Sequence, residues 1–178
     1  MRSALDELNR RKAEADARVA EYRALLARFR ALIDAGKLNV KIIDGRMVVA
    51  LASDILFPSA SAALSKEGRA AIDEVAVVLA SIPDRRFQVE GHTDDLPIKT
   101  AQFPSNWELA AARALTVTRA MVDAGLPEAR VSAASYGAAK PAVTSATPEG
   151  RAQNRRIEVV VVPDLSTLPG FDELQKAR

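Results

Sequence analysis

The sequence predicts an α/β fold, a two-layer sandwich with helices on one face of a small mixed β-sheet, preceded by a long N-terminal coiled-coil helix. Three observations support this prediction. Short runs alternate apolar with polar residues, as half-buried strands do. Longer stretches repeat apolar residues every three or four positions, as amphipathic helices do. The two kinds of segment alternate along the chain, an order typical of helices layered on a sheet.

Length and composition suit one globular domain with an extension, since the chain has 178 residues, 48% of them hydrophobic and 27% charged. We expect a heptad helix over residues 1–36, a domain over residues 37–163 and a tail over residues 164–178. The net charge of +2 is too small to create a general field for nucleic acid or an anionic membrane, so we expect no nucleic-acid partner. The absence of cysteine excludes disulfides and thiolate metal sites.

The N-terminal segment repeats apolar residues at alternating spacings of three and four, with Lys12 as the single polar interruption. The seam consists of Leu5, Leu8, Ala15, Val19, Tyr22, Leu26, Phe29 and Ile33. A strict seam is narrower than the apolar stripe of an ordinary surface helix, which favours a parallel coiled coil that forms a homodimer. The alternative is one amphipathic helix that packs on its own domain. Gly36 is a suitable residue to end the helix.

A β-hairpin is predicted next, because two alternating runs, 38–43 and 46–51, flank the pair Asp44 and Gly45. Asp-Gly between such runs favours a type I′ turn. A small polar loop follows, and a helix is predicted over residues 66–81. The helix places Ile72, Val75 and Leu79 on one face.

The central stretch begins with a strand over residues 87–91 and continues into a loop that carries Asp94. Ser105 and Glu108 have the S-x-x-E spacing of a capping box, so we expect the serine to accept from an amide near Glu108 while the glutamate reaches back to the serine's amide. Arg113 then lies about two turns into the following helix.

Strand end, loop and helix therefore bring Asp94 and Arg113 to opposite sides of one crevice. A carboxylate binds an ammonium group, and a guanidinium fork binds a carboxylate through two parallel hydrogen bonds. The pair could hold a zwitterion such as an amino-acid head group. The alternative is that Asp94 and Arg113 form a salt bridge with each other.

The C-terminal part of the domain contains two more predicted strands. Residues 130–136 form the first, and IEVVVV, over residues 157–162, is a near-continuous apolar run that should be central in its sheet. Between them Thr147 and Pro148 predict the start of a short helix that runs through Asn154. The tail after Pro163 either packs loosely on the domain or frays.

Catalysis and metal binding find little support in the sequence. His92 is the only histidine, and a hydrolytic zinc site normally takes three protein ligands, so we expect no metal and a structural role in which the ring bonds nearby backbone or the sheet end. No G-x-S-x-G elbow occurs, and Glu90 and Asp94 lie on one short segment instead of flanking a groove. We predict a protein that is not an enzyme and needs no cofactor.

Three ordered segments, GHTDDLPI, SNWELAAARA and GRAQNRRIEVVV, resemble the OmpA-like peptidoglycan-binding domain, in the variant with an enlarged loop found in MotB-type flagellar stator proteins. The similarity covers roughly residues 48–162. In that family the matching aspartate and arginine hold diaminopimelate of the peptidoglycan stem peptide, which implies these roles for Asp94 and Arg113. Two features depart from the family pattern: the loop carries PIKTAQFP, and Ala110 replaces the usual serine.

The resemblance also implies further site residues. It places Thr93, Leu109, Asn154 and Arg155 in the binding site, with Asn154 and Arg155 near the ligand's main-chain carboxyl. Phe57, Ser59 and Ser61 are the candidate pocket rim, although each serine taken singly is better explained as an ordinary loop serine, and Arg155 could equally form salt bridges on a solvated helix end.

The resemblance implies a periplasmic or cell-envelope anchor that binds peptidoglycan without catalysis. Its native precursor is then expected to carry an export signal or membrane anchor, which this sequence lacks. The alternative is a coiled-coil adaptor whose head binds another envelope protein, with Arg151, Arg155 and Arg156 meeting an acidic partner.

Overall fold

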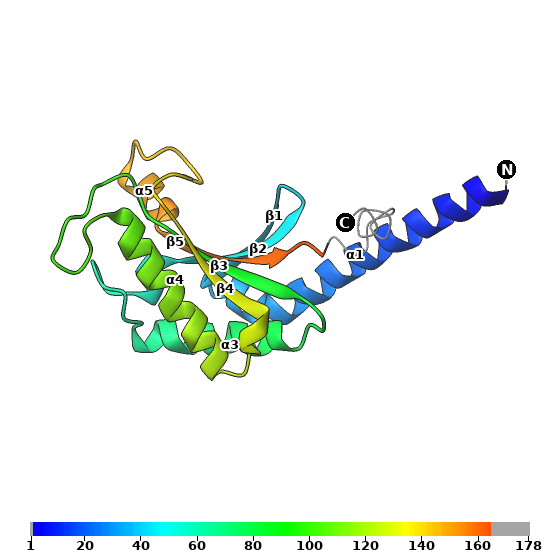
Figure 1. Cartoon of the computed structure of the whole chain (residues 1–178), viewed down its shortest axis with the longest axis horizontal. Coiled ribbons are helices and arrows are strands. Elements are labelled where there is room, and N and C mark those ends of the chain that lie inside the picture. Colours follow the sequence, from blue (N-terminus) through cyan, green and yellow to red (C-terminus); the bar gives the residue numbers. More distant parts are fainter. Residues whose placement is uncertain (1, 165–178) are drawn as a thin grey trace, which may run out of the picture.

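The computed structural model describes residues 2–164, with side chains from residue 5 onward, and confirms the predicted α/β fold (Figure 1). One mixed sheet has the strand order β1-β2-β5-β3-β4, in which β3 and β4 are parallel and every other neighbouring pair is antiparallel. The elements are α1 (Arg2–Asp34), β1 (Leu38–Ile43), β2 (Arg46–Ala52), α2 (Ser53–Leu56), α3 (Lys66–Ala80), β3 (Arg86–His92), α4 (Asn106–Asp123), the 3₁₀ turn η1 (Glu128–Arg130), β4 (Val131–Gly137), α5 (Pro148–Asn154) and β5 (Arg156–Val162).

The core lies between one face of the sheet and the helices α1, α3 and α4, which share a single apolar cluster. The strand register explains which residues enter it. Val49, Val159 and Val89 lie opposite one another on β2, β5 and β3, and all three are buried in that cluster. Because side chains alternate along a strand, the next row, Ala50, Glu158 and Glu90, lies on the opposite face. The prediction of a central IEVVVV strand is confirmed.

Within residues 2–164, helix α1 projects away from the domain over its N-terminal part and packs on it near its C-terminal end (Figure 1). Leu5 and Leu8 are 58% and 63% exposed, whereas Leu25, Phe29 and Leu32 are buried. The last turns of the predicted seam pack on the domain, where Phe29 is buried together with Leu25 and Leu32, which the seam did not include. A helix that packs into a globular core presents a wider stripe than a coiled-coil seam.

Local signals in the sequence fix several element boundaries. Asp44 and Gly45 both have positive φ, 50° and 72°, as a type I′ turn requires. The predicted capping box at the start of α4 differs in detail. The Ser105 hydroxyl accepts from the Trp107 amide and also donates to the Glu108 carboxylate, a side-chain bond that the prediction did not include.

One expectation lies outside the described residues. The predicted tail packing concerns residues 165–178, which the structure does not describe. Within residues 2–164, no helix combines the length and the apolar composition that a bilayer crossing requires.

Candidate functional site

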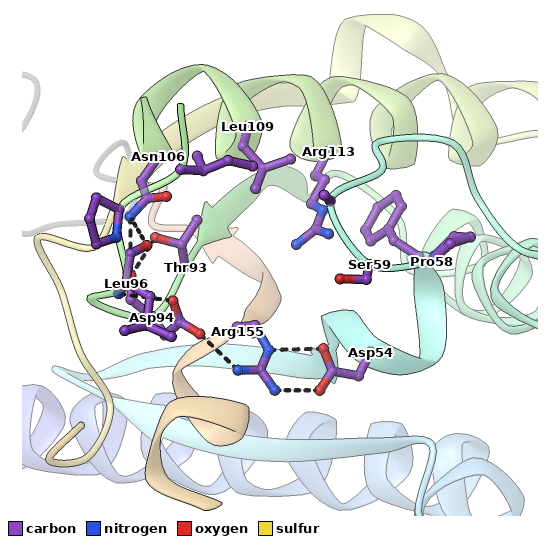
Figure 2. Close-up of a pocket in the computed structure, with 14 residues that line it drawn as sticks. Asp54, Pro58, Ser59, Thr93, Asp94, Leu96, Asn106, Leu109, Arg113 and Arg155 are labelled. Atoms are coloured by element: carbon purple, nitrogen blue, oxygen red, sulfur yellow. Dashed lines mark hydrogen bonds and ion pairs between the residues drawn. The ribbon is translucent and has the colours of Figure 1, made fainter. Parts of the chain in front are cut away.

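A pocket of about 570 Å³ opens at the end of β3, between the first turns of α4, the loop after α2 and the loop after β3 (Figure 2). Pairing of β3 with β4 and β5 holds the strand end in place, and the chain then leaves the sheet at Thr93. The pocket is lined by Asp54, Phe57, Pro58, Ser59, Ala60, Thr93, Asp94, Leu96, Pro97, Ile98, Asn106, Leu109, Arg113 and Arg155.

Asp94 is held at the pocket wall by two donors. Its Oδ1 accepts from the Leu96 amide at 3.1 Å, and its Oδ2 accepts from Nη1 of Arg155 at 2.7 Å. Asp94 is 8% exposed, so the carboxylate is nearly buried yet still borders the pocket. An ionised carboxylate offers about four lone-pair sites, so these two bonds leave acceptor capacity for a ligand.

Arg155 bridges Asp94 to a second carboxylate, Asp54, which the sequence analysis did not identify. Nε and Nη2 of Arg155 donate to the two Asp54 oxygens at 3.0 and 2.7 Å (Figure 2). The hydrogen bonds from Arg155 lower the pKa of Asp54, and the bonds to Asp54 and Asp94 raise the pKa of Arg155 above its usual range. The contact joins positions 101 residues apart, and Asp54 sits in a four-residue helix, so no local pattern marks it.

Arg113 projects from α4 into the pocket as the second cation (Figure 2). Its Nε donates to the Ser61 carbonyl at 2.8 Å, and its guanidinium carbon lies 5.0 Å from the centre of the Phe57 ring. Burial lowers the pKa of Arg113, while Asp54 and Asp94 act to raise it. No carboxylate of residues 5–164 lies within salt-bridge distance of Arg113. The alternative that Arg113 and Asp94 pair with each other is therefore wrong, because Asp94 pairs with Arg155.

Asn106 and Thr93 fix the loop that carries Asp94. The Asn106 amide donates to the Asp94 and Leu96 carbonyls at 3.4 and 3.0 Å, and the Thr93 amide donates to the Gly137 carbonyl at 2.8 Å. Asn106 directly follows the N-cap of α4, so the start of the helix and the loop position are coupled. The sequence analysis did not assign a role to Asn106.

Some of the other predicted site residues line the pocket, and two of them, Ser61 and Asn154, do not. Phe57, Ser59 and Leu109 line the pocket. Ser61 contributes its carbonyl to Arg113, while its hydroxyl accepts from the Ala63 amide in the loop. The remaining candidate, Asn154, does not line the pocket.

Asn154 is fully buried, and its side chain is used to hold a neighbouring loop. Its Oδ1 accepts from the Ala142 and Val143 amides at 2.8 and 3.0 Å, and its Nδ2 donates to the Val143 carbonyl and the Ser145 hydroxyl. The structure therefore corrects the placement of Asn154 near a ligand carboxyl, since its amide is fully hydrogen-bonded within the protein.

His92 also lies away from the pocket, on the sheet face opposite the helices. Its ring stacks on Tyr136 and lies near the carboxylates of Glu90 and Glu158. Neither ring nitrogen has a hydrogen-bond partner among the described residues, so the expected bond to nearby backbone is not formed. Glu90, His92 and Glu158 are the described side chains placed to hold a metal ion.

The pocket's charges balance: Asp54 and Asp94 are negative, and Arg113 and Arg155 are positive. The arrangement suits recognition of a group that carries both charges, with fixed donors at Arg113 and remaining acceptor capacity at Asp94.

Comparison with known proteins identifies relatives of this chain. Motility protein B of Bacillus subtilis is 34% identical over 128 residues, which cover 71% of this chain and 49% of that protein. The peptidoglycan-binding protein ArfA of Mycobacterium bovis is 34% identical over 107 residues, 60% of this chain and 32% of that protein. The chain therefore spans half or less of the length of these two relatives.

A solved structure, the cell wall anchor of the T6SS from Pseudomonas aeruginosa, superposes with a TM-score of 0.72 at 34% identity, covering 79% of this chain and 97% of that one. The OmpA family model matches residues 56–155. This segment runs from the end of α2 to Arg155, and so includes Asp94, Arg113 and most of the pocket lining. By this match and by its relatives, the chain belongs to the OmpA family.

Proposed function

We propose that the pocket binds peptidoglycan through the free amino-acid end of diaminopimelate in a stem peptide, without catalysis, and so anchors a cell-envelope protein to the wall. The observation that carries the proposal is the buried guanidinium of Arg113, which faces the pocket without a carboxylate partner among residues 5–164. A buried cation is costly unless a counter-charge reaches it. A ligand carboxylate supplies that charge.

The binding mode follows from the two ends of the pocket. Arg113 has already used Nε on the Ser61 carbonyl, so its two terminal nitrogens take the ligand carboxylate as a fork. The ligand ammonium binds Asp94, whose carboxylate keeps acceptor capacity beyond its bonds from Leu96 and Arg155. Arg155 donates a hydrogen bond to Asp94, and Asp54 holds Arg155 in the position that this bond requires.

Two relatives support the proposal through what their names say of them. One is described as a peptidoglycan-binding protein and one as a cell wall anchor, and both share about a third of their aligned residues with this chain. A periplasmic or cell-envelope location follows from the same proposal, because the ligand is found there.

The adaptor alternative has less support. It relied on Arg151, Arg155 and Arg156 forming a basic surface for an acidic partner. Arg155 is paired with Asp54 and Asp94, and Arg156 is buried against Glu158 at 2.6 Å, so these two arginines are used within the domain.

Dimerisation through α1 would strengthen wall binding. The exposed N-terminal seam, which includes Leu5, Leu8 and Val19, offers an apolar stripe to a second copy of the chain. Two linked heads on a polymeric wall gain avidity from a high effective concentration, even when each head binds weakly.

Sedimentation with purified sacculi tests the proposal. The wild-type chain is expected to sediment, whereas Arg113→Ala and Asp94→Ala remain in solution with unchanged circular dichroism. Asp95→Asn is the matched control, because it removes an exposed carboxylate from the same loop without touching the pocket lining. Equal sedimentation of all four proteins would exclude this pocket as the binding site.

A further inference from the structure

A cluster of buried ionisable side chains lies on the sheet face that the helices do not cover. Glu90 and His92 are two residues apart on β3, and Glu158 on β5 lies directly opposite Glu90 in the strand register. Their exposed fractions are 3%, 2% and 8%. None of the three lines the pocket, so recognition of a zwitterion leaves the cluster without a role.

The spacing of the three groups is longer than that of hydrogen bonds. Nε2 of His92 lies 3.7 Å from Oε2 of Glu90 and 3.6 Å from Oε2 of Glu158, and the potential ligand atoms all lie within 4.8 Å of one another. Bonds of about 2.0–2.2 Å around a tetrahedral zinc ion separate neighbouring ligand atoms by roughly 3.3–3.6 Å. The 3.6 Å separation lies at the upper end of this range and the 3.7 Å separation just beyond it, so the histidine and the two carboxylates lie close to the positions of ligands that share one ion.

Neighbouring donors orient both carboxylates toward the histidine. The Gln88 amide donates to Oε1 of Glu90 at 3.0 Å, and Nε of Arg156 donates to Oε1 of Glu158 at 2.6 Å. Each carboxylate thus presents its second oxygen, Oε2, to Nε2 of His92. Such outer contacts fix the ligands of a metal before it binds.

The ring of His92 is held in place by stacking, but its two nitrogens have no hydrogen-bond partner among the described residues. Its ring stacks on Tyr136, with centroids 5.2 Å apart and planes inclined by 13°. Neither ring nitrogen makes a hydrogen bond within the described part of the chain, although buried polar atoms are nearly always paired. Nε2 of His92 and one oxygen from each of Glu90 and Glu158 thus converge on one point, where a single cation could contact all three groups.

From this geometry we propose that Glu90, His92 and Glu158 bind one divalent cation of the Zn²⁺ type. An imidazole with two carboxylates is a ligand set that suits a borderline ion, with water as the fourth ligand. The ion enters past Glu158 and Arg156, whose side chains each keep 10% exposure. It joins β3 to β5 two residues before Asp94 and three residues after Arg155, and so stiffens the base of the pocket.

Metal binding by the full chain, stripped with a chelator, tests the proposal. Zn²⁺ is titrated in competition with a chromophoric chelator, and Co²⁺ is used as a spectroscopic substitute whose visible bands report tetrahedral coordination. We expect one ion per chain, an increase in the melting temperature with Zn²⁺, and at least tenfold weaker binding in His92→Gln and Glu158→Gln. Asp95→Asn is the matched control, since it removes an exposed carboxylate three residues after His92 and is expected to leave Zn²⁺ binding within twofold.

Two results would overturn the proposal. The first is the absence of saturable Zn²⁺ binding and of tetrahedral Co²⁺ bands in the wild-type chain, which would mean that the carboxylates face a proton on His92 instead of a metal. The second is equal binding by wild type, His92→Gln and Glu158→Gln, which would place the ion elsewhere. Glu158→Gln keeps the shape of the side chain, so the test remains valid if His92→Gln fails to fold.

Discussion

Replacing Arg113 with lysine separates the charge of this residue from its geometry. Lysine keeps the positive charge but loses the planar fork, and it cannot reproduce the Nε bond to the Ser61 carbonyl. If Arg113 binds a ligand carboxylate through two parallel hydrogen bonds, the variant retains at most one of them. Charge-assisted hydrogen bonds contribute about 1.5–3 kcal/mol each, so we expect roughly 10- to 100-fold weaker binding.

The assay is isothermal titration of the purified chain with free diaminopimelate, repeated with cadaverine as a ligand that carries two ammonium groups and no carboxylate. Urea unfolding is measured in parallel, because loss of the bond to Ser61 costs about 1 kcal/mol of stability. Wild type is expected to prefer diaminopimelate, and Arg113→Lys to weaken that binding while it stays folded. Unchanged affinity in the folded variant would refute the guanidinium fork as the carboxylate-binding group.

Three further predictions follow from other parts of the structure. Gly91→Ala should lower the free energy of unfolding by about 1–3 kcal/mol in urea, because an added Cβ would meet the backbone of Ala110 on α4; unchanged stability would contradict this packing. Acidification should lower the free energy of unfolding of the wild-type protein as the pH falls below the ordinary pKa of Asp54. Arg155 lowers the pKa of Asp54 in the folded state, so the stabilisation that this pair provides is lost when Asp54 is protonated. Asp54→Asn should flatten the acid limb of a pH-stability profile, and identical profiles would contradict the role of the pair. Deletion of residues 1–19 should convert a dimer into a folded monomer in light scattering, whereas monomers in both cases would exclude the α1 seam.

The sequence predicted most elements of the fold because their signals are local. Alternation identified the strands, and Asp44 with Gly45 fixed the hairpin turn. The central position of β5 followed from its apolar run. The alternation of a strand and the type of a turn each depend on residues that are close together in the sequence, so the sequence alone predicts them.

The site was less predictable, because its main contacts join distant parts of the chain. Asp94 and Arg113 were identified as pocket residues, but the partner of Asp94 is Arg155, 61 residues away. Asp54 was missed for the same reason. Asn154 was misplaced because its position next to Arg155 does not show that its side chain points to the loop that contains Ala142 and Val143. Sequence order alone carries no information about which way such side chains point.

The bridge made by Arg155 has a consequence for how the protein matures. Arg155 immediately precedes β5, the final strand of the sheet in chain order and its middle strand in space. A growing chain that has not yet produced this segment lacks both the middle of the sheet and the clamp between Asp54 and Asp94. If the pocket binds peptidoglycan as proposed, ligand competence is therefore acquired only after β5 has been synthesised, and a chain that ends before Arg155 is expected not to bind the wall.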